Sequence, residues 1–416
     1  RNKILFTIFI IFVFRVGTHV TVPGINAESL KQLSDLPFLN MLNLVSGNAM
    51  NNFSIFSMGV SPYITASIIV QLLQMDIYPK FVEWGKQGEV GRRKLNQATR
   101  YITLVLAFVQ SIGITASFNT LSSISLVKTP NVSTYLLIGT ILTAGSIIVT
   151  WLGEQITDKG FGNGVSMIIF SGIIASIPKM FSTIYEDFFV NVRSGELTRS
   201  YIIVALLIVV GLAIVFFTTF VQQAEYQIPI QYTKLVQGAP TSSYLPLKVN
   251  PAGVIPVIFA SSITTIPSTI LPFFSKVSWL SHLQGLLSYN TPSGMITYAI
   301  LIILFSFFYT FVQVNPEKTA ENLQKNGSYI PSVRPGRETE KYMSSLLKRL
   351  ATIGAVFLAF ISLAPIAAQQ FMHLTSSIAL GGTSLLILIS TGIEGMKQLE
   401  GYLLKRQYVG FMNLED

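Results

Sequence analysis

The sequence predicts an all-α membrane protein with ten transmembrane helices arranged as two inverted five-helix halves. Half of the 416 residues are apolar and the mean hydropathy is +0.56. Only 11% of the residues are charged, against roughly 25% in soluble domains. The apolar residues gather in runs of about twenty, the length of helix that crosses ~30 Å of hydrocarbon. This composition excludes an ordinary soluble enzyme.

The first apolar run, residues 4–22, opens the chain without the short apolar core and small-residue cleavage site of a signal peptide, so we interpret it as a retained span. Nine further runs of similar length follow along the chain. They lie near residues 58–76, 101–121, 134–152, 163–181, 200–221, 253–274, 295–314, 347–367 and 380–398.

The basic residues predict how the chain is oriented. Ten crossings place both termini on one side, and if that side is inside, 21 of the 28 Lys and Arg residues fall on inner segments and 7 on outer ones. Cytoplasmic segments are enriched in Lys and Arg. The sequence therefore predicts a multi-pass protein of the cell membrane with both termini in the cytoplasm.

An internal repeat indicates the inverted halves. The segments GVSPYITASII (59–69) and GVIPVIFASSI (253–263) share seven of eleven positions, and they open spans two and seven. Because five spans separate them, the two copies enter the membrane from opposite sides, as inverted-topology repeats do. Chance similarity between apolar helices is the alternative. The repeat predicts an N-terminal half, 1–190, and a C-terminal half, 191–416, with the functional centre where they meet.

Ionisable residues are scarce within the predicted spans, which disfavours a small-molecule transporter, although that class also uses inverted repeats. Arg15 and Glu394 lie towards the ends of their spans, where snorkelling to the interface explains them. Glu154 and Glu225 lie at the predicted interfaces. A transporter would instead need a midplane site built from charged residues or unwound helices.

Other function classes find little support. An intramembrane protease would need a serine and a histidine at similar depth, but the histidines are all placed towards the outer side. With no cysteine in the chain, disulfides, thiolate metal sites and cysteine nucleophiles are excluded. The phosphate-loop pattern G-x-x-x-x-G-K-[ST] is absent, so any nucleotide hydrolysis must come from a partner. We expect no catalytic residue, cofactor, metal site or direct DNA binding.

Several of the predicted spans carry aliphatic side chains on one helix face, which could point toward a common axis. Val60 and Ile64 are four residues apart on one helix face, as are Ile169 and Ile173, and Ile258 occupies the repeat position equivalent to Ile64. Ordinary helix packing explains any single pair. The recurrence in both repeat copies favours an apolar constriction that excludes ions by dewetting.

Two inner loops, 222–252 and 315–346, are longer than simple connections require. The second contains YIPSVRPGRET, whose prolines and glycine predict an exposed, turn-rich projection rather than a helix. Such loops are either solvated anchors that set the topology or docking surfaces for a cytoplasmic partner.

Five segments resemble the SecY family of bacterial protein-translocation channels, in order and over essentially the whole chain. They are GVSPYITASIIVQLL, GFGNGVSMIIFSGI (160–173), NPAGVIPVIFASSI (250–263), IPSVRPGRET (330–339) and GGTSLLI (381–387). The resemblance implies a passive channel with an hourglass-shaped pore, and not an enzyme. Such a channel conducts unfolded polypeptides across the membrane and releases apolar segments sideways into lipid.

The resemblance also implies roles for particular residues. The pore ring that closes the channel corresponds to Val60, Ile64, Ile169, Ile173, Ile258 and Ile387. The plug, residues 47–57, includes Asn48, Met50, Asn51, Asn52 and Phe53. The composition of this segment by itself indicates only a short, poorly hydrophobic stretch that is not a span, and an interfacial loop is the alternative. The lateral gate, on spans two and seven, includes Pro62, Thr65, Ser67, Pro256, Ser261 and Ser262. Breakers and small residues of this kind let the gate helices bend or shear, and they fit tight helix packing equally well. The partner-docking loop includes Arg334, Arg337 and Lys341, and the part played by Arg337 stays open.

The partners implied by the resemblance are both membrane-bound and cytoplasmic. They comprise SecE-like and SecG-like small membrane subunits, the SecA translocation ATPase, the ribosome, unfolded secretory polypeptides with their signal sequences, and membrane lipids. A ribosome or the ATPase would drive transport through the passive channel.

Overall fold

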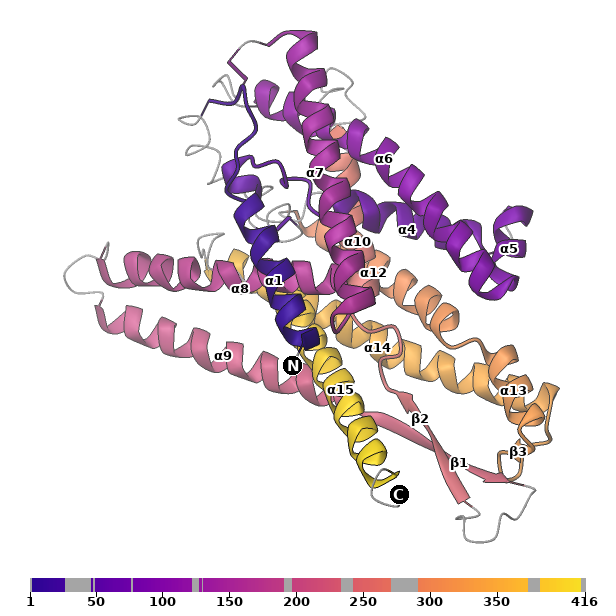
Figure 1. Cartoon of the computed structure of the whole chain (residues 1–416). Coiled ribbons are helices and arrows are strands. Elements are labelled where there is room, and N and C mark those ends of the chain that lie inside the picture. The colour runs from indigo at the N-terminus through magenta and orange to yellow at the C-terminus, as the bar shows by residue number, and fades with distance from the viewer. Residues whose placement is uncertain are drawn as a thin grey trace.

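In the computed structural model, a helix lies on each of the ten predicted spans (Figure 1). These helices are α1 (Asn2–Gly17), α4 (Ser61–Leu73), α6 (Gly88–Leu121), α7 (Val132–Lys159), α8 (Gly164–Tyr185), α9 (Leu197–Gln223), α10 (Ile255–Ile270), α12 (Pro292–Gln313), α14 (Arg337–Met372) and α15 (Gly382–Met412). The structure describes residues 2–26, 46–47, 49–75, 78–121, 127–128, 130–190, 197–232, 242–270, 291–372 and 382–412.

Within these described ranges, six helices are long and apolar enough to cross a membrane: α6, α7, α8, α9, α12 and α14. The two helices of the internal repeat, α4 and α10, are shorter apolar helices. The 13 residues of α4 extend about 20 Å at 1.5 Å per residue, which is less than the hydrocarbon thickness. The protein is therefore a multi-pass, all-α membrane protein in which both repeat helices are short.

The two repeat copies fold alike where they begin. Gly59 has φ +51° and Gly253 has φ +62°, a left-handed conformation that favours glycine. Each helix starts two residues later, with Pro62 or Pro256 at its second position. The predicted spans near 58–76 and 253–274 were therefore too long at their N-terminal ends, because the glycine step is not helical.

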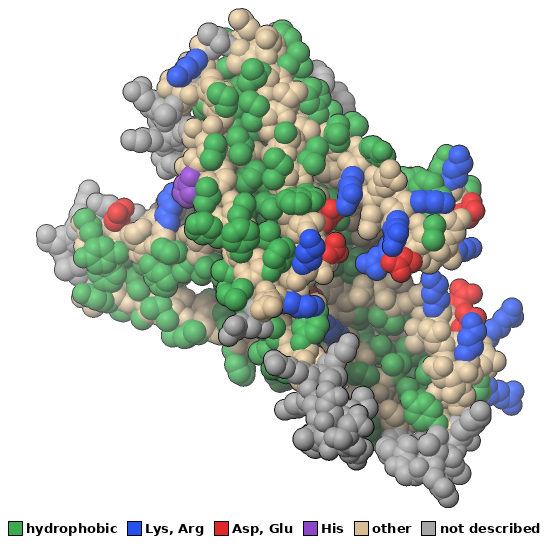
Figure 2. Space-filling view, in the orientation of Figure 1, with side chains coloured by type: hydrophobic (Ala, Val, Ile, Leu, Met, Phe, Trp, Pro, Cys, Tyr) green, Lys and Arg blue, Asp and Glu red, His purple; other side chains and the backbone are tan. Residues whose placement is uncertain are grey.

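A central apolar core joins eight of the helices. Its buried side chains come from α1, α4, α7, α8, α10, α12, α14 and α15. By contrast, most of the apolar surface of α9 is exposed. The surface of α7, α8 and α9 is largely hydrophobic in Figure 2, whereas charged side chains gather over α5 (Pro79–Lys86), the start of α6 and α13 (Pro316–Lys325).

The two long inner loops contain structure that the sequence did not predict. β1 (Glu225–Tyr232) pairs antiparallel with β2 (Ser242–Lys248) and with β3 (Ser328–Tyr329), in the order β2-β1-β3. The interpretation of 315–346 as a turn-rich projection was wrong for α13, which Asn315 caps by accepting a hydrogen bond from the Lys318 amide. The same interpretation is confirmed for residues 331–336, which form turns. Ser332 and Gly336 have positive φ there, and α14 begins at Arg337.

Candidate functional site

All six aliphatic residues singled out as a ring lie in the same buried core cluster. They are Val60, Ile64, Ile169, Ile173, Ile258 and Ile387, and none is more than 9% exposed. They come from α4 and the residue before it, α8, α10 and α15, which are far apart in the sequence. The structure thus buries within one extended apolar cluster the six side chains that sequence reasoning connected only through periodicity and resemblance.

A tight glycine-rich turn from α7 positions the start of α8. The side chain of Asn163 accepts hydrogen bonds from the amides of Val165 and Ser166, which caps the first turn of α8. A Cβ added at Gly164 would lie only 1.7 Å from the carbonyl oxygen of Gly153. Because the two main chains touch here, the first turn of α8 has little freedom to shift against α7.

The 47–57 segment is folded back on itself and is not a span, as its composition predicts. It contains η1 (Ala49–Asn52), a single turn of 3₁₀ helix. Met50 and Phe53 are buried in a second apolar cluster, while Asn51 and Asn52 are half-buried. Asn48 lies outside the described residues.

Main-chain hydrogen bonds hold this segment against the residues that follow α1. The amide of Ile55 donates to the carbonyl of Val20 at 2.9 Å, and the amide of Val22 donates to the carbonyl of Phe53 at 3.1 Å. A Cβ at Gly145 of α7 would lie 1.8 Å from the carbonyl oxygen of Ile55. The segment is therefore packed main chain to main chain between α7 and the end of α1.

Arg15 was misinterpreted at the sequence level. Its guanidinium does not snorkel outward: Nη1 donates to the carbonyl of Gly47 at 2.7 Å, and Nη2 donates to the carbonyl of Ser171 at 3.0 Å. Gly47 belongs to the 47–57 segment, and Ser171 lies on α8 between Ile169 and Ile173. An arginine within an apolar run was the available signal, but its acceptors are main-chain groups that no side-chain pattern reveals.

The prolines assigned to the lateral gate do not interrupt its helices. Pro62 and Pro256 both lie in the first turn, where the missing N–H has no helical partner to lose and the fixed φ suits the helix. The expectation that they act as helix breakers was therefore wrong. They define where α4 and α10 begin.

The hydroxyl groups on α4 and α10 bond within their own helices. Those of Thr65, Ser261 and Ser262 donate to carbonyls three or four residues earlier, at 2.8–3.2 Å. Ser67 accepts from the side-chain amide of Gln71 at 3.3 Å. The two helices contact each other and both contact α6. These hydrogen bonds would survive a separation of α4 from α10.

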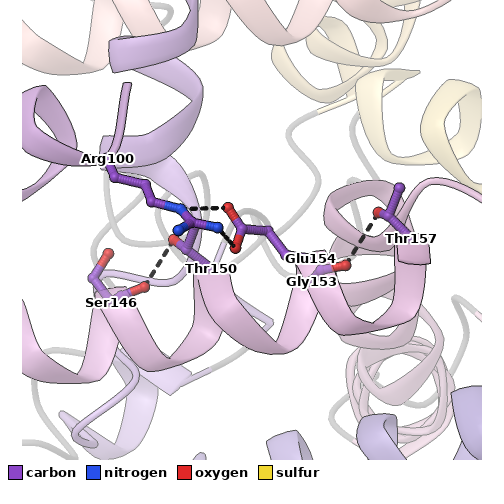
Figure 3. A network of polar contacts seen from close by, with 6 residues as sticks. All are labelled: Arg100, Ser146, Thr150, Gly153, Glu154 and Thr157. Atoms are coloured by element: carbon purple, nitrogen blue, oxygen red, sulfur yellow. Dashed lines mark hydrogen bonds and ion pairs between the residues drawn. The ribbon is translucent and has the colours of Figure 1, made fainter. Parts of the chain in front are cut away.

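The carboxylates near the predicted interfaces are paired. Arg100 on α6 forms a bidentate ion pair with Glu154 on α7, at 3.0 Å and 2.5 Å (Figure 3). Glu225 pairs with Lys397 at 3.0 Å. Among the described residues, no group of three or more His, Asp or Glu side chains could hold a metal ion. Glu154 and Glu225 thus form ion pairs between elements.

The two inner loops form one unit on a small apolar core of their own. Ile228 of β1, Ile330 and Met343 are buried together there, and the Tyr329 hydroxyl donates to Gln231 Oε1 at 2.8 Å. This core supports the turn between β3 and α14 as a fixed platform.

The three basic residues of the predicted docking loop lie exposed on or beside this turn. They are Arg334, Arg337 and Lys341. Lys341 pairs with Glu338 at 3.1 Å, and the main-chain carbonyl of Arg334 accepts from the Thr339 hydroxyl at 2.9 Å. Both arginine side chains are therefore presented to solvent on an ordered turn.

Comparison with known proteins identifies the family. The SecY family model matches residues 54–396. The protein translocase subunits SecY of Streptococcus sanguinis (strain SK36) and Streptococcus gordonii (strain Challis) are 71% and 72% identical, over 100% and 99% of this chain and 97% and 96% of their own lengths.

Three solved structures share the fold at low sequence identity. A protein-conducting channel has a TM-score of 0.69 at 16% identity, a SecY structure concerning a plug domain that stabilizes the closed channel has 0.67 at 16%, and canine Sec61 in a ribosome-channel complex has 0.64 at 15%. Each alignment covers 96% of this chain and 91% of the other. The chain belongs to the SecY family of protein translocase subunits, which are channels and not enzymes.

Proposed function

We propose that this chain is the pore-forming subunit of a Sec translocase, which conducts unfolded polypeptides across the cell membrane and releases apolar segments into lipid. The observation that carries the proposal is the burial of the six aliphatic residues in one apolar cluster, to which α4, α8, α10 and α15 all contribute. In this proposal, residues 1–190 and 191–416 form the two halves, and the cluster is the waist between them.

An aliphatic waist suits a substrate that presents every kind of side chain in turn. Fixed charges or hydrogen-bond donors would hold some residues and stall the chain, whereas apolar contacts are non-directional. Closely packed aliphatic groups also exclude water and ions when no chain is present. The 47–57 segment is the resting plug in this proposal, because it packs against α1, α7 and α8 beside the ring.

Lateral release follows from the physics of transfer between water and lipid. A segment of about 20 apolar residues gains several kcal/mol on entering lipid, and a polar segment loses by the same move. α4 and α10 form the gate in this proposal, with Thr65, Ser67, Ser261 and Ser262 as its small polar residues. Opening it leaves the intrahelical hydrogen bonds of these residues intact.

Partners supply the energy and complete the assembly. Arg334, Arg337 and Lys341 on the loop platform are proposed to dock a ribosome or the SecA ATPase, since basic side chains on a fixed turn suit anionic surfaces. SecE-like and SecG-like subunits are proposed to cover apolar helix surface such as that of α9. The excess of basic residues on the inner segments supports cytoplasmic termini.

Crosslinking from the ring to a translocating chain tests the proposal. Single cysteines at Val60, Ile173 and Ile258, on this naturally cysteine-free background, should crosslink to a stalled secretory polypeptide. Cysteine at Ile174, which is 43% exposed on α8, is the control and should remain unlinked. Crosslinks at Ile174 but not at Ile173 would place the substrate path outside the cluster and overturn the proposal.

Neutralising the carboxylates separates a conduit from an ion-coupled transporter. We expect Glu154→Gln and Glu394→Gln to keep secretion within about twofold of the wild type. The ion pair of Glu154 with Arg100 lies near the surface, where such a pair contributes only ~0–1 kcal/mol, and Glu394 is exposed. The measurement is the rate of export of a secretory precursor. Loss of all transport in either variant, with the protein still present in the membrane, would favour the transporter.

A further inference from the structure

The guanidinium of Arg15 links two segments that are far apart in the sequence. One of its nitrogen atoms donates to the Gly47 carbonyl of the 47–57 segment, and the other donates to the Ser171 carbonyl of α8. The ion pairs of the described residues do not include Arg15. Its partners are therefore two main-chain oxygen atoms, one on each side of the junction between the 47–57 segment and α8.

At this junction the two main chains touch. A Cβ added at Gly172 would lie 2.3 Å from the Cα atom of Gly47, and Gly47 has φ +69°. Any side chain at either glycine would separate the two segments or strain the backbone. The contact therefore depends on the absence of side chains, and Arg15 holds it from the α1 side.

The junction lies next to the ring. Ser171 is between Ile169 and Ile173, two of the proposed ring residues, so a movement of this turn of α8 also moves the acceptor of Arg15. A planar guanidinium can bond two acceptors at once from a fixed fork, whereas an ammonium group is a single point of charge. This geometry makes the position of the 47–57 segment depend on the position of α8.

We propose that Arg15 is a positioning residue that latches the 47–57 segment to α8 in the idle channel. Outward displacement of Ile169 and Ile173 by an entering chain would pull Ser171 away from Gly47 and break one of the two hydrogen bonds. The 47–57 segment is then released from α8 only when the ring residues move apart. This inference rests on the proposed function, since it takes the 47–57 segment as the resting plug.

Labelling of a buried cysteine tests the latch directly. Met50 is 3% exposed, so the Met50→Cys chain, expressed in bacterial membranes with its natural subunits, should react slowly with a membrane-impermeant maleimide. Adding Arg15→Met should increase the labelling rate at least about tenfold, because both guanidinium hydrogen bonds are lost and losing even one hydrogen bond to a charged group has an effect of about that size. Arg15→Lys should increase it by less, because lysine still reaches one carbonyl.

Two further variants control for charge and for folding. Lys179→Met removes one positive charge from an exposed position of α8 and should leave the labelling rate unchanged. Gly172→Ala keeps Arg15 but pushes the segment off α8, and it should increase labelling as Arg15→Met does. Each variant is first checked for normal abundance in the membrane.

Ionic conductance of the idle channel, measured on the same membranes, separates the latch from the proposed function. Faster labelling together with a higher conductance in Arg15→Met supports both. Faster labelling with unchanged conductance supports the latch but contradicts the role of the segment as a seal. Labelling of Arg15→Met at the rate of Lys179→Met, with Gly172→Ala also unchanged, would overturn the latch.

Discussion

Replacing Ile173 by asparagine should turn the idle channel into an ion leak. Ile173 is 1% exposed in the central cluster, and an amide there offers hydrogen bonds to water where the aliphatic side chain offers none. A constriction that gates by dewetting should then stay wet. We expect the resting conductance to increase by at least about tenfold, which corresponds to ~1.4 kcal/mol, as measured by electrophysiology on reconstituted channels.

The matched control is Ile174→Asn on the same helix. Ile174 is 43% exposed and faces away from the cluster, so this substitution should leave the resting conductance near that of the wild type. Equal leaks from the two variants would mean that general loosening of α8, and not wetting of a waist, causes the effect. No leak from Ile173→Asn would argue against the ring as the seal.

The second large effect is expected from Gly164→Ala, at the turn between α7 and α8. The new Cβ would lie 1.7 Å from the Gly153 carbonyl oxygen, and the Gly164 amide also donates to the Thr157 hydroxyl at 2.9 Å. Main-chain atoms cannot swing aside as a flexible side chain can. Overpacking of this kind costs about 1–3 kcal/mol, so the thermal denaturation midpoint of the purified protein should fall by several degrees.

Gly211→Ala on α9 provides the control for helix propensity. Nothing lies within 4 Å of a Cβ at this position, and alanine is the better helix former. We expect an unchanged or slightly higher midpoint. If Gly164→Ala matched Gly211→Ala, the close approach of α7 and α8 would carry no energetic weight.

The apolar runs were sufficient to locate the helices, because a membrane requires about twenty apolar residues at each crossing. They did not define the ends of α4 and α10. There the left-handed conformations of Gly59 and Gly253 delay the helices, and Pro62 and Pro256 occupy their first turns. The three-stranded sheet was also missed, since β1 and β3 are about a hundred residues apart and strand pairing is not a local property.

The ring residues show what periodicity and resemblance can predict and what they cannot. Ile169 and Ile173 share a helix face by spacing alone, but spacing says nothing about which other helix that face meets. Ile387 of α15 joins them only through tertiary packing. Arg15 marks the opposite case: sequence reasoning placed it correctly near the end of a span and assigned the wrong direction to its side chain.

The sequence by itself determined the class of protein, the spans and the identity of the aliphatic candidates, because hydropathy, charge and helical period are properties of a chain read in order. Only the tertiary structure decided where the Arg15 guanidinium finds its acceptors and where glycine main chains touch. Both kinds of contact involve main-chain atoms, which every residue carries alike. Only the folded structure therefore decides which main-chain groups come into contact.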